Sequence, residues 1–264
     1  LFAVRMFPYL PYDNTPNRWG GIHFFADSHD NRLTQCDIHS GDYGIQCDST
    51  QVTEDSPPLL LLDNCVVHNI GGPGLVLTHC RTQVTGTQVS NTLGHCVDIS
   101  GGAHTFVHCT IAQFYPLSAR RGDALSLGDS DGEVFRPLLW AHFLNCVITG
   151  YADDVIMGHF AETTLPEADF LFQNSLLRTP ATADVERFRR VRYDLPDSLD
   201  VSGKDHFRLF DTHAFLYDFT PDSLSAIRGM ADPDCARLFP VDRLGRSRLA
   251  DGQPDAGAYE GDYE

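Results

Sequence analysis

An acidic run contains the densest group of potential metal ligands in the sequence. Residues 128–133 read Gly-Asp-Ser-Asp-Gly-Glu and place carboxylates on alternate residues, at Asp129, Asp131 and Glu133. Alternating oxygen ligands are typical of the start of a calcium-binding loop. The stretch lacks the other ligands of an EF-hand loop, and an acidic hairpin tip would explain the same residues. Calcium at these three carboxylates is therefore the one cofactor that we consider.

A second group of residues could support acid–base chemistry. Asp153 and Asp154 lie in a predicted turn, where they could bind calcium, act as acid and base, or simply form the turn. Arg120, Arg121 and Asp123 precede a predicted strand and could face a groove, as a polysaccharide lyase would require. The twelve histidines show no His-x-His or His–Glu pairing with metal-ligand spacing. We therefore assign no catalytic residue, and an enzyme is the less favoured interpretation.

The eight cysteines are interpreted from their spacing. Cys36, Cys65, Cys109 and Cys146 occupy the same slot of a recurring short motif. Equivalent residues of stacked repeats point the same way, and free cysteine behaves as a small buried hydrophobe. We predict that these four thiols form an inward structural ladder without disulfides. No C-x-x-C pair occurs, which argues against a zinc site.

Composition excludes several classes of function. The formal net charge is −17, so the surface repels nucleic acid and anionic lipid. No apolar run approaches the roughly 20 residues of a membrane-spanning helix. The chain starts at Leu1 without a visible signal peptide, and we expect that it is a segment of a longer protein.

An internal repeat determines the predicted fold. Cys65, Thr87 and Cys109 are each separated by 22 residues, and other copies of the motif lie 29 or 37 residues apart. A second series of apolar segments follows the first by about ten residues, each after a Gly- or Asp-bearing turn. Repeats of this size bury a core only when they stack. The apolar residues two positions after the motif's Cys slot would form a second inward ladder: Ile38, Val67, Val89, Ile111, Ile148 and Leu177.

These patterns predict an all-β, right-handed parallel β-helix with two strands per repeat, long insertions, a short helix and a C-terminal cap. We expect an extended segment or insertion over 1–18, coils over 19–178, and an irregular or helical region with the cap over 179–264. The short helix is expected over Thr182–Arg192, a helical turn over Leu224–Met230, and a strand end over Phe207–Phe210. A leucine-rich repeat is the competing solenoid, but the repeated strands favour β-branched residues.

The C-terminal segment carries a more specific pattern. Asp242, Gly245 and Arg248 form a D-x-x-G-x-x-R pattern, and residues 254–260 read Pro-Asp-Ala-Gly-Ala-Tyr-Glu. This tail resembles the C-terminal signature of bacterial parallel β-helix proteins of the choice-of-anchor type, with Ala256 in place of the usual Ile. Residues 19–24, Trp-Gly-Gly-Ile-His-Phe, resemble the W-x-G-I strand of the same proteins. The resemblance implies a leader, often lipidated, further coils upstream, and a non-catalytic tail that closes the end of the β-helix.

Three functions remain open at this stage. The first is a non-catalytic extracellular or cell-surface protein, an accessory subunit of an outer-membrane assembly whose loops engage a protein partner. The second is a polysaccharide lyase or hydrolase, by analogy with other parallel β-helices. The third is a glycan-binding module, because aromatic residues near turns and insertions, including Phe25, Phe135 and Trp140, could stack on sugars or contact a protein.

Overall fold

The computed structural model describes residues 15–130, 134–151, 156–161, 164–165, 167–194 and 203–262. Its strands form three parallel sheets, which we number 1 to 3. Sheet 1 contains β1 (Ile22–Phe24), β4 (Ile45–Cys47), β7 (Leu75–Thr78), β10 (Val97–Ser100), β13 (Leu125–Gly128) and β16 (Ile156–His159). Sheet 2 contains β2 (Asn31–Thr34), β5 (Leu60–Asp63), β8 (Arg81–Thr85), β11 (Gly102–Val107), β14 (Leu138–Leu144), β17 (Phe170–Gln173) and β19 (Phe188–Arg189). Sheet 3 contains β3 (Asp37–His39), β6 (Val66–Ile70), β9 (Gln88–Thr92), β12 (Thr110–Gln113), β15 (Val147–Gly150), β18 (Leu176–Leu177) and β20 (Arg192–Tyr193).

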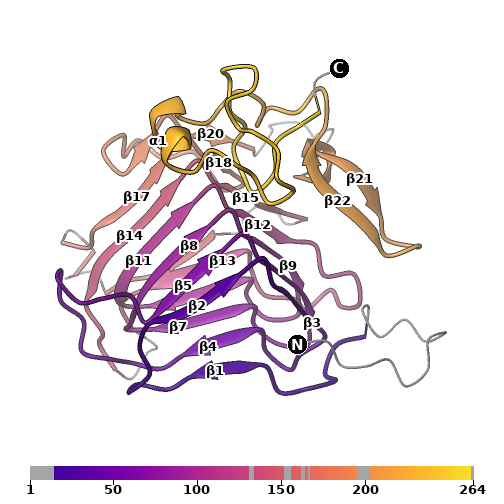
Figure 1. Ribbon diagram of the computed structural model, residues 1–264. Helices are drawn as coiled ribbons and strands as arrows, with labels where there is room; N and C mark the ends of the chain where they lie inside the picture. The colour runs from indigo at the N-terminus through magenta and orange to yellow at the C-terminus, as the bar shows by residue number, and fades with distance from the viewer. Residues whose placement is uncertain are drawn as a thin grey trace.

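The chain visits the three sheets in turn, so that each coil has three sides (Figure 1). Strands of successive coils pair in parallel, and most pair without a register shift. This is a parallel β-helix, and the predicted fold class is confirmed. The prediction of two strands per repeat is wrong, because sheet 2 supplies a third. Its strands share no recurring motif, whereas sheet 3 follows the Cys slot and sheet 1 follows the Gly- or Asp-bearing turns.

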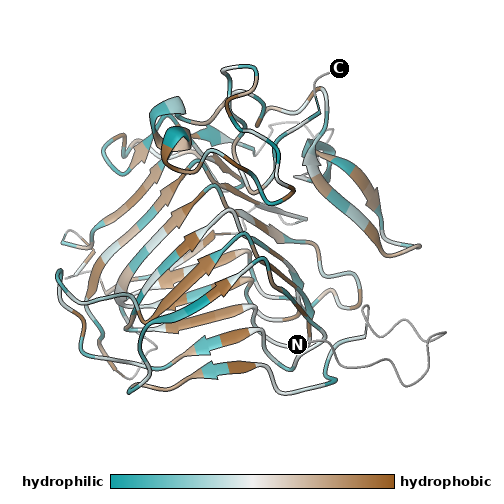
Figure 2. Cartoon of the chain, viewed as in Figure 1, coloured by the Kyte–Doolittle hydropathy of each residue, from teal (hydrophilic) through white to brown (hydrophobic). Residues whose placement is uncertain are grey.

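The core runs along the inside of the coils. The predicted aliphatic ladder is present: Ile38 pairs with Val67, Val67 with Val89, and the series continues to Leu177, all at most 5% exposed. Sheet 2 adds a column of stacked rings, with centroids 4.8 Å apart for Phe106–Phe143 and 4.9 Å apart for Phe143–Phe172. Apolar segments recur from coil to coil in Figure 2. Stacking therefore buries a continuous narrow core that a single coil could not form.

A left-handed residue turns the chain between sheets 2 and 3, at a corner that we call the 2–3 corner. It immediately precedes the Cys slot, or the equivalent position, of each coil, and its φ lies between 49° and 56° in every coil. Gly and Asn adopt this conformation at low cost, which explains why Asn so often precedes the slot in the sequence. The residues are Gln35, Asn64, Gly86, His108, Asn145, Asn174 and Arg190.

The C-terminal segment lies along the side of the β-helix, beside sheet 3 and the 2–3 corner (Figure 1). It begins with a short 3-10 helix (Gly203–His206), continues through the antiparallel hairpin β21 (Phe207–Asp211) and β22 (Leu216–Pro221), and includes α1 (Pro233–Leu238). The tail after α1 reaches from Asn145 back to the first described coil, where Arg243 hydrogen-bonds Gln35. We expected this cap to close the end of the β-helix. It covers the flank instead, and β9, β12 and β15 are buried on both faces.

Two local predictions in this region are wrong. Thr182–Arg192 is not a helix: a turn leads into β19 and β20, which add a short further coil. Parallel pairing with β17 and β18 overrides the helical spacing of Val185, Phe188 and Val191, since Phe188 stacks on Phe172 at 5.1 Å. Residues 224–230 form turns, and the α-helix begins at Pro233, after the N-cap Asp232. The predicted strand end over Phe207–Phe210 is part of β21.

None of the helices in the described residues is long and apolar enough to span a bilayer.

Candidate functional site

Asp129, the described member of the predicted calcium group, joins two insertions. It is 2% exposed and accepts hydrogen bonds from the hydroxyl of Thr164 and, at 3.4 Å, from the backbone N–H of Ala161. Asp131 and Glu133 lie outside the described residues. Within the described ranges no three His, Cys, Asp or Glu side chains come close enough to hold a metal ion. The contacts of Asp129 connect the loop after β13 to the loop after β16.

The candidate acid–base residues do not converge. The guanidinium of Arg121 lies 4.8 Å from the ring centroid of Tyr151, whereas the carboxylate of Asp123 lies 3.5 Å from His95. The backbone N–H of Arg120 donates to Ser118, and its side chain is exposed. Asp153 and Asp154 lie outside the described residues. The described members of this set therefore make separate local contacts rather than a shared site.

The predicted thiol ladder lies at the start of sheet 3. Cys65, Cys109 and Cys146 are at most 1% exposed and Cys36 is half-buried; all four are free thiols. The backbone N–H of Cys36 donates to the sulfur of Cys65 at 3.4 Å, and Thr87 and Ser175 accept equivalent bonds in other coils. Burial raises the pKa of the Cys65 thiol to about 12. A buried thiol that keeps its proton is a poor nucleophile, which agrees with a structural role for Cys65.

The outer face of sheet 2 carries an arrangement that the sequence did not reveal. Trp140 is half-buried on β14, and its indole N–H donates to Thr105 of the neighbouring coil at 3.3 Å. The guanidinium of Arg81, one coil further, lies 5.2 Å from the Trp140 ring centroid. A cation over an indole is attracted to the face of the ring. Three successive coils therefore present one ordered aromatic group on this face.

Polar side chains continue this face, which we call the Trp140 face and define as Arg81, Gln83, Thr105, Trp140, His142 and Asp169. His142 lies 3.3 Å from Asp169 of the next coil. Arg81 also donates to the carbonyls of Glu54 and Ser56, so the insertion after β4 folds against the edge of the face. The alternation Trp140-Ala141-His142, with Ala141 buried, is the sequence signal that could have placed both side chains outside.

Insertions gather at the corner between sheets 1 and 2. The loops after β13 and β16 are connected through Asp129, and Arg187, in the loop after β18, donates to the carbonyl of Leu165 at 2.9 Å. These three loops expose large apolar side chains, with fractional exposures between 40% and 70%. We call this group the apolar loop patch; its members are Val134, Phe135, Leu165 and Val185.

The C-terminal motif folds into a buried charge network. Arg248, Asp242 and Asp255 are fully buried, and Glu260 is 3% exposed. The carboxylates accept backbone N–H groups, including Leu244 and Arg246 at Asp242. The guanidinium of Arg248 donates at 3.1 Å to the carbonyls of Gly257 and Ala258. The spacing of the motif residues in the tail is thus explained by the hydrogen bonds that they make within the tail.

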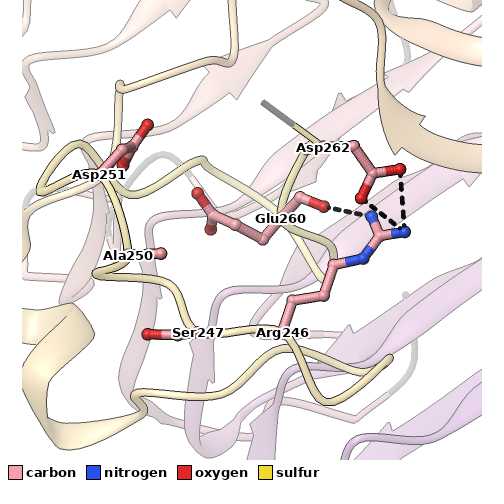
Figure 3. Close-up of a pocket in the computed structure, with 7 residues that line it drawn as sticks. Arg246, Ser247, Ala250, Asp251, Glu260 and Asp262 are labelled. Carbon is pink, nitrogen blue, oxygen red and sulfur yellow. Dashed lines mark hydrogen bonds and ion pairs between the residues drawn. The ribbon is translucent and has the colours of Figure 1, made fainter. Parts of the chain in front are cut away.

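A pocket of about 720 Å³ lies on the outer side of this network (Figure 3). Arg246 reaches the carbonyl of Glu260 at 2.8 Å and the carboxylate of Asp262 at 2.9 Å, while Asp251 lies apart from them. Burial, followed by the nearby Asp255 carboxylate, raises the pKa of Glu260 to about 8. Glu260 therefore keeps its proton to higher pH than an ordinary glutamate does, and its carboxyl oxygens accept the backbone N–H of Asp255. The residues that line the pocket are therefore explained by contacts that stabilise the tail.

The comparison with protein families agrees with this architecture. Residues 12–113 match the family model for a right handed beta helix region. The chain is a right-handed parallel β-helix. The described part of the match ends with β12, and the later coils extend the same three sheets. No curated protein and no solved structure matches the chain.

Proposed function

We propose that the chain is a non-catalytic binding protein of the bacterial cell surface or extracellular space. In this proposal it is an accessory subunit of an outer-membrane assembly and engages a protein partner through the apolar loop patch. Its anchor would lie in an N-terminal region outside this sequence. The resemblance of the C-terminal tail to choice-of-anchor proteins supports this setting, and its buried, backbone-capping motif fits a structural tail.

The apolar loop patch is the observation that carries the proposal. Phe135 is 55% exposed and Val185 is 70% exposed, although both belong to loops that contact neighbouring loops. Apolar side chains grouped on one surface are typical of protein interfaces. A rigid solenoid would present these loops together, since Asp129 and Arg187 connect them.

A paired substitution tests the protein-partner proposal. We expect Phe135→Asp with Val185→Asp to reduce recovery of a membrane partner at least tenfold in cross-linked pull-downs from solubilised outer membranes. Leu209→Asp with Leu216→Asp is the matched control, because those side chains are 44% and 54% exposed on the distant hairpin. Recovery of monomer alone with the unmodified chain, or equal losses from both variants, would contradict the proposal.

The Trp140 face favours a second candidate function, the binding of a neutral or acidic glycan. An aromatic ring with adjacent hydrogen-bonding side chains suits a sugar, which offers an apolar face and hydroxyl edges. Neighbouring coils repeat at about 4.8 Å, so successive coils could contact successive parts of an extended chain.

Glycan arrays separate the second candidate from the first. Trp140→Ala should abolish glycan retention, whereas Phe25→Ala, which removes a 59% exposed ring outside this face, should leave it unchanged. Retention without cleavage would support a binding module. Release of shortened or unsaturated products would instead indicate the lyase or hydrolase alternative, and no retention on a broad array would remove the glycan candidate.

A further inference from the structure

A pocket of about 220 Å³ lies between the 2–3 corner and the cap. One side of it comes from three successive coils, and the other side comes from residues 239–241 and Arg248 of the cap. Pro240 and Val241 are exposed, whereas His108 and Arg248 are fully buried, so the pocket leads from the surface into the interior. It is smaller than the roughly 300–1,000 Å³ of pockets for drug-sized ligands, and it therefore suits a ligand of few atoms.

Gly86 creates the space for this pocket. The 2–3 corner carries Asn64, Gly86 and His108 in successive coils, so the middle coil lacks a side chain where both neighbours have one. A Cβ built on Gly86 would lie 2.2 Å from Oδ1 of Asn64, so any larger residue would intrude on this amide. Successive coils repeat at about 4.8 Å, so the backbones of Asn64 and His108 lie roughly 10 Å apart on either side of the gap.

Two buried N–H groups of the lining have no acceptor among the residues that the structure describes. Nδ2 of Asn145 donates to Nε2 of His108 at 2.9 Å, so the ring proton is on Nδ1, which has no hydrogen-bond partner. Nε of Arg248 has none either, although its terminal nitrogens donate to carbonyls of the cap. A buried donor without an acceptor costs stability, so both groups call for a partner from outside the chain.

Acceptors line the same pocket. Nδ2 of Asn64 donates to Oδ1 of Asp63 at 3.2 Å, which leaves Oδ1 of Asn64 buried and without a partner in the described part of the chain. Thr85 donates to the same Asp63 oxygen at 2.6 Å, and no described residue donates to Oδ2 of Asp63. Asp63 and Arg248 are the charged side chains of the lining, so its formal charge is zero. The ligand should therefore carry both donors and acceptors and have no net charge.

We propose that this pocket binds a free α-amino acid as its zwitterion. The carboxylate accepts from Nδ1 of His108 and Nε of Arg248, and the ammonium group donates to Asp63 and to Oδ1 of Asn64. An anion alone would be repelled by Asp63, and a cation alone would leave both N–H groups unpaired. Residues 239–241, Phe-Pro-Val, add an apolar wall for a small side chain. The site is independent of both binding surfaces proposed above.

Ligand-observed NMR and titration calorimetry with the full chain test the proposal. The probes are glycine, alanine and serine, with acetate and methylamine as the two halves of the zwitterion. We expect saturable binding of at least one amino acid, at least about tenfold tighter than that of acetate or methylamine, because each half leaves one set of groups unpaired. Equal binding of either half would overturn the proposal. Absence of binding by every probe at millimolar concentration would also overturn it and would leave the pocket to water.

Two substitutions locate the site. Asp63→Asn removes the carboxylate but keeps an oxygen that can accept from Thr85, and we expect affinity to fall about tenfold. Gly86→Asn fills the gap with a residue that suits the left-handed corner, and it should abolish binding. Asp98→Asn, on the outer face of sheet 1, is the matched control and should bind as the unmodified chain does.

Circular dichroism reports whether each variant keeps the fold. Unchanged affinity in folded Asp63→Asn or folded Gly86→Asn would overturn the assignment of this pocket, as would an equal loss in Asp98→Asn. If one variant does not fold, the other variant and the series of probes decide.

Discussion

Asn145 connects the β-helix to its C-terminal cap through both its backbone and its side chain. Its φ of 56° belongs to the left-handed corner, and its carbonyl accepts the N–H of Gly257 at 2.8 Å. Its Oδ1 accepts the N–H of Asp232 at 2.8 Å, which orients the amide so that Nδ2 faces Nε2 of His108 at 2.9 Å. Burial holds the pKa of His108 well below its usual value. The neutral ring therefore accepts at Nε2 and carries its proton on Nδ1.

Substitutions of Asn145 should separate these two roles. Asn145→Gly keeps the left-handed backbone and loses the side-chain bonds, so we expect a loss of about 1–3 kcal/mol in the free energy of unfolding. Asn145→Ala should lose about 1–2 kcal/mol more, because a Cβ disfavours this backbone. Urea denaturation measures both values. Equal stability of the two variants would show that the backbone conformation contributes nothing.

Glu260 should give the protein an unusual dependence on pH. Its folded-state pKa of about 8 lies above the ordinary value near 4.5, so the folded state retains a proton that the unfolded state releases. The stabilisation from this group is complete below about pH 4.5 and is lost as pH rises through 8. Between these limits it should fall by about 1.4 kcal/mol per pH unit.

The Glu260→Gln variant tests this dependence by denaturation at pH 5.5, 7 and 8.5. We expect its unfolding free energy to vary less with pH than that of the unmodified chain. Asp27→Asn changes an exposed carboxylate in another part of the chain and should preserve the original profile. Parallel profiles for Glu260→Gln and the unmodified protein would contradict the assignment.

The stability of sheet 2 depends on a column of stacked phenylalanine rings. Phe106, Phe143, Phe172 and Phe188 stack at centroid distances of 4.8, 4.9 and 5.1 Å, with interplanar angles below 20°. Each ring comes from a different coil, because parallel in-register strands bring equivalent side chains together. The column therefore couples coils that are far apart in sequence.

Truncation of a central ring should be costly. Phe143→Ala leaves a cavity between two rings and should lower the free energy of unfolding by about 3–5 kcal/mol, whereas Phe143→Leu should cost less. Phe25→Ala, at a 59% exposed position, should change it by less than about 0.5 kcal/mol. Thermal and urea denaturation provide the comparison. Similar losses at Phe143 and Phe25 would show that stacking does not stabilise sheet 2.

At the scale of the molecule, the cap contacts distant coils at once. Tyr259 donates to Gln88 at 2.6 Å, Ala258 to Thr110 at 3.0 Å, and Arg243 to Gln35 at 2.8 Å. A bare solenoid has contacts only between neighbouring coils. The cap adds connections along the axis, and the buried Arg248 holds together the part of the cap that makes them.

Loss of Arg248 should release the cap. Arg248→Met removes a buried positive charge that offsets the buried carboxylates of Asp242 and Asp255, and we expect a cost of about 3–5 kcal/mol. Limited proteolysis should then cleave within residues 240–260 before the coils. Arg246→Met, at a more exposed arginine of the same segment, is the control. Cleavage at the same rate in both variants would argue against this role.

The sequence predicted the parts of the molecule that repeat. The Cys slot and the residues two positions later gave the inward ladder of sheet 3, and the Gly- and Asp-bearing turns gave sheet 1. Sheet 2 was not predicted, because its strands share no recurring sequence motif. Leu60, Arg81 and Trp140, for example, lie at or near the starts of three of its strands and differ in type. The position of the cap on the flank was not predicted either. Its contacts, such as that between Tyr259 and Gln88, form only when the C-terminal segment runs back along the axis of the β-helix. The Trp140 face was not predicted for the same reason, because its residues belong to separate coils and come together only in the folded chain.

The position of the cap has a consequence for synthesis on the ribosome. Residues 203–262 emerge after the coils that they cover, and chains fold from the N-terminus as they are made. Until then, polar groups such as Gln88 and Thr110 face water rather than the cap. The nascent coils can stack early, but the outer face of sheet 3 remains solvated, with its amide hydrogens open to exchange, until the segment that contains Tyr259 has been synthesised. We therefore expect the cap to cover the outer face of sheet 3 late in folding, after the coils have formed.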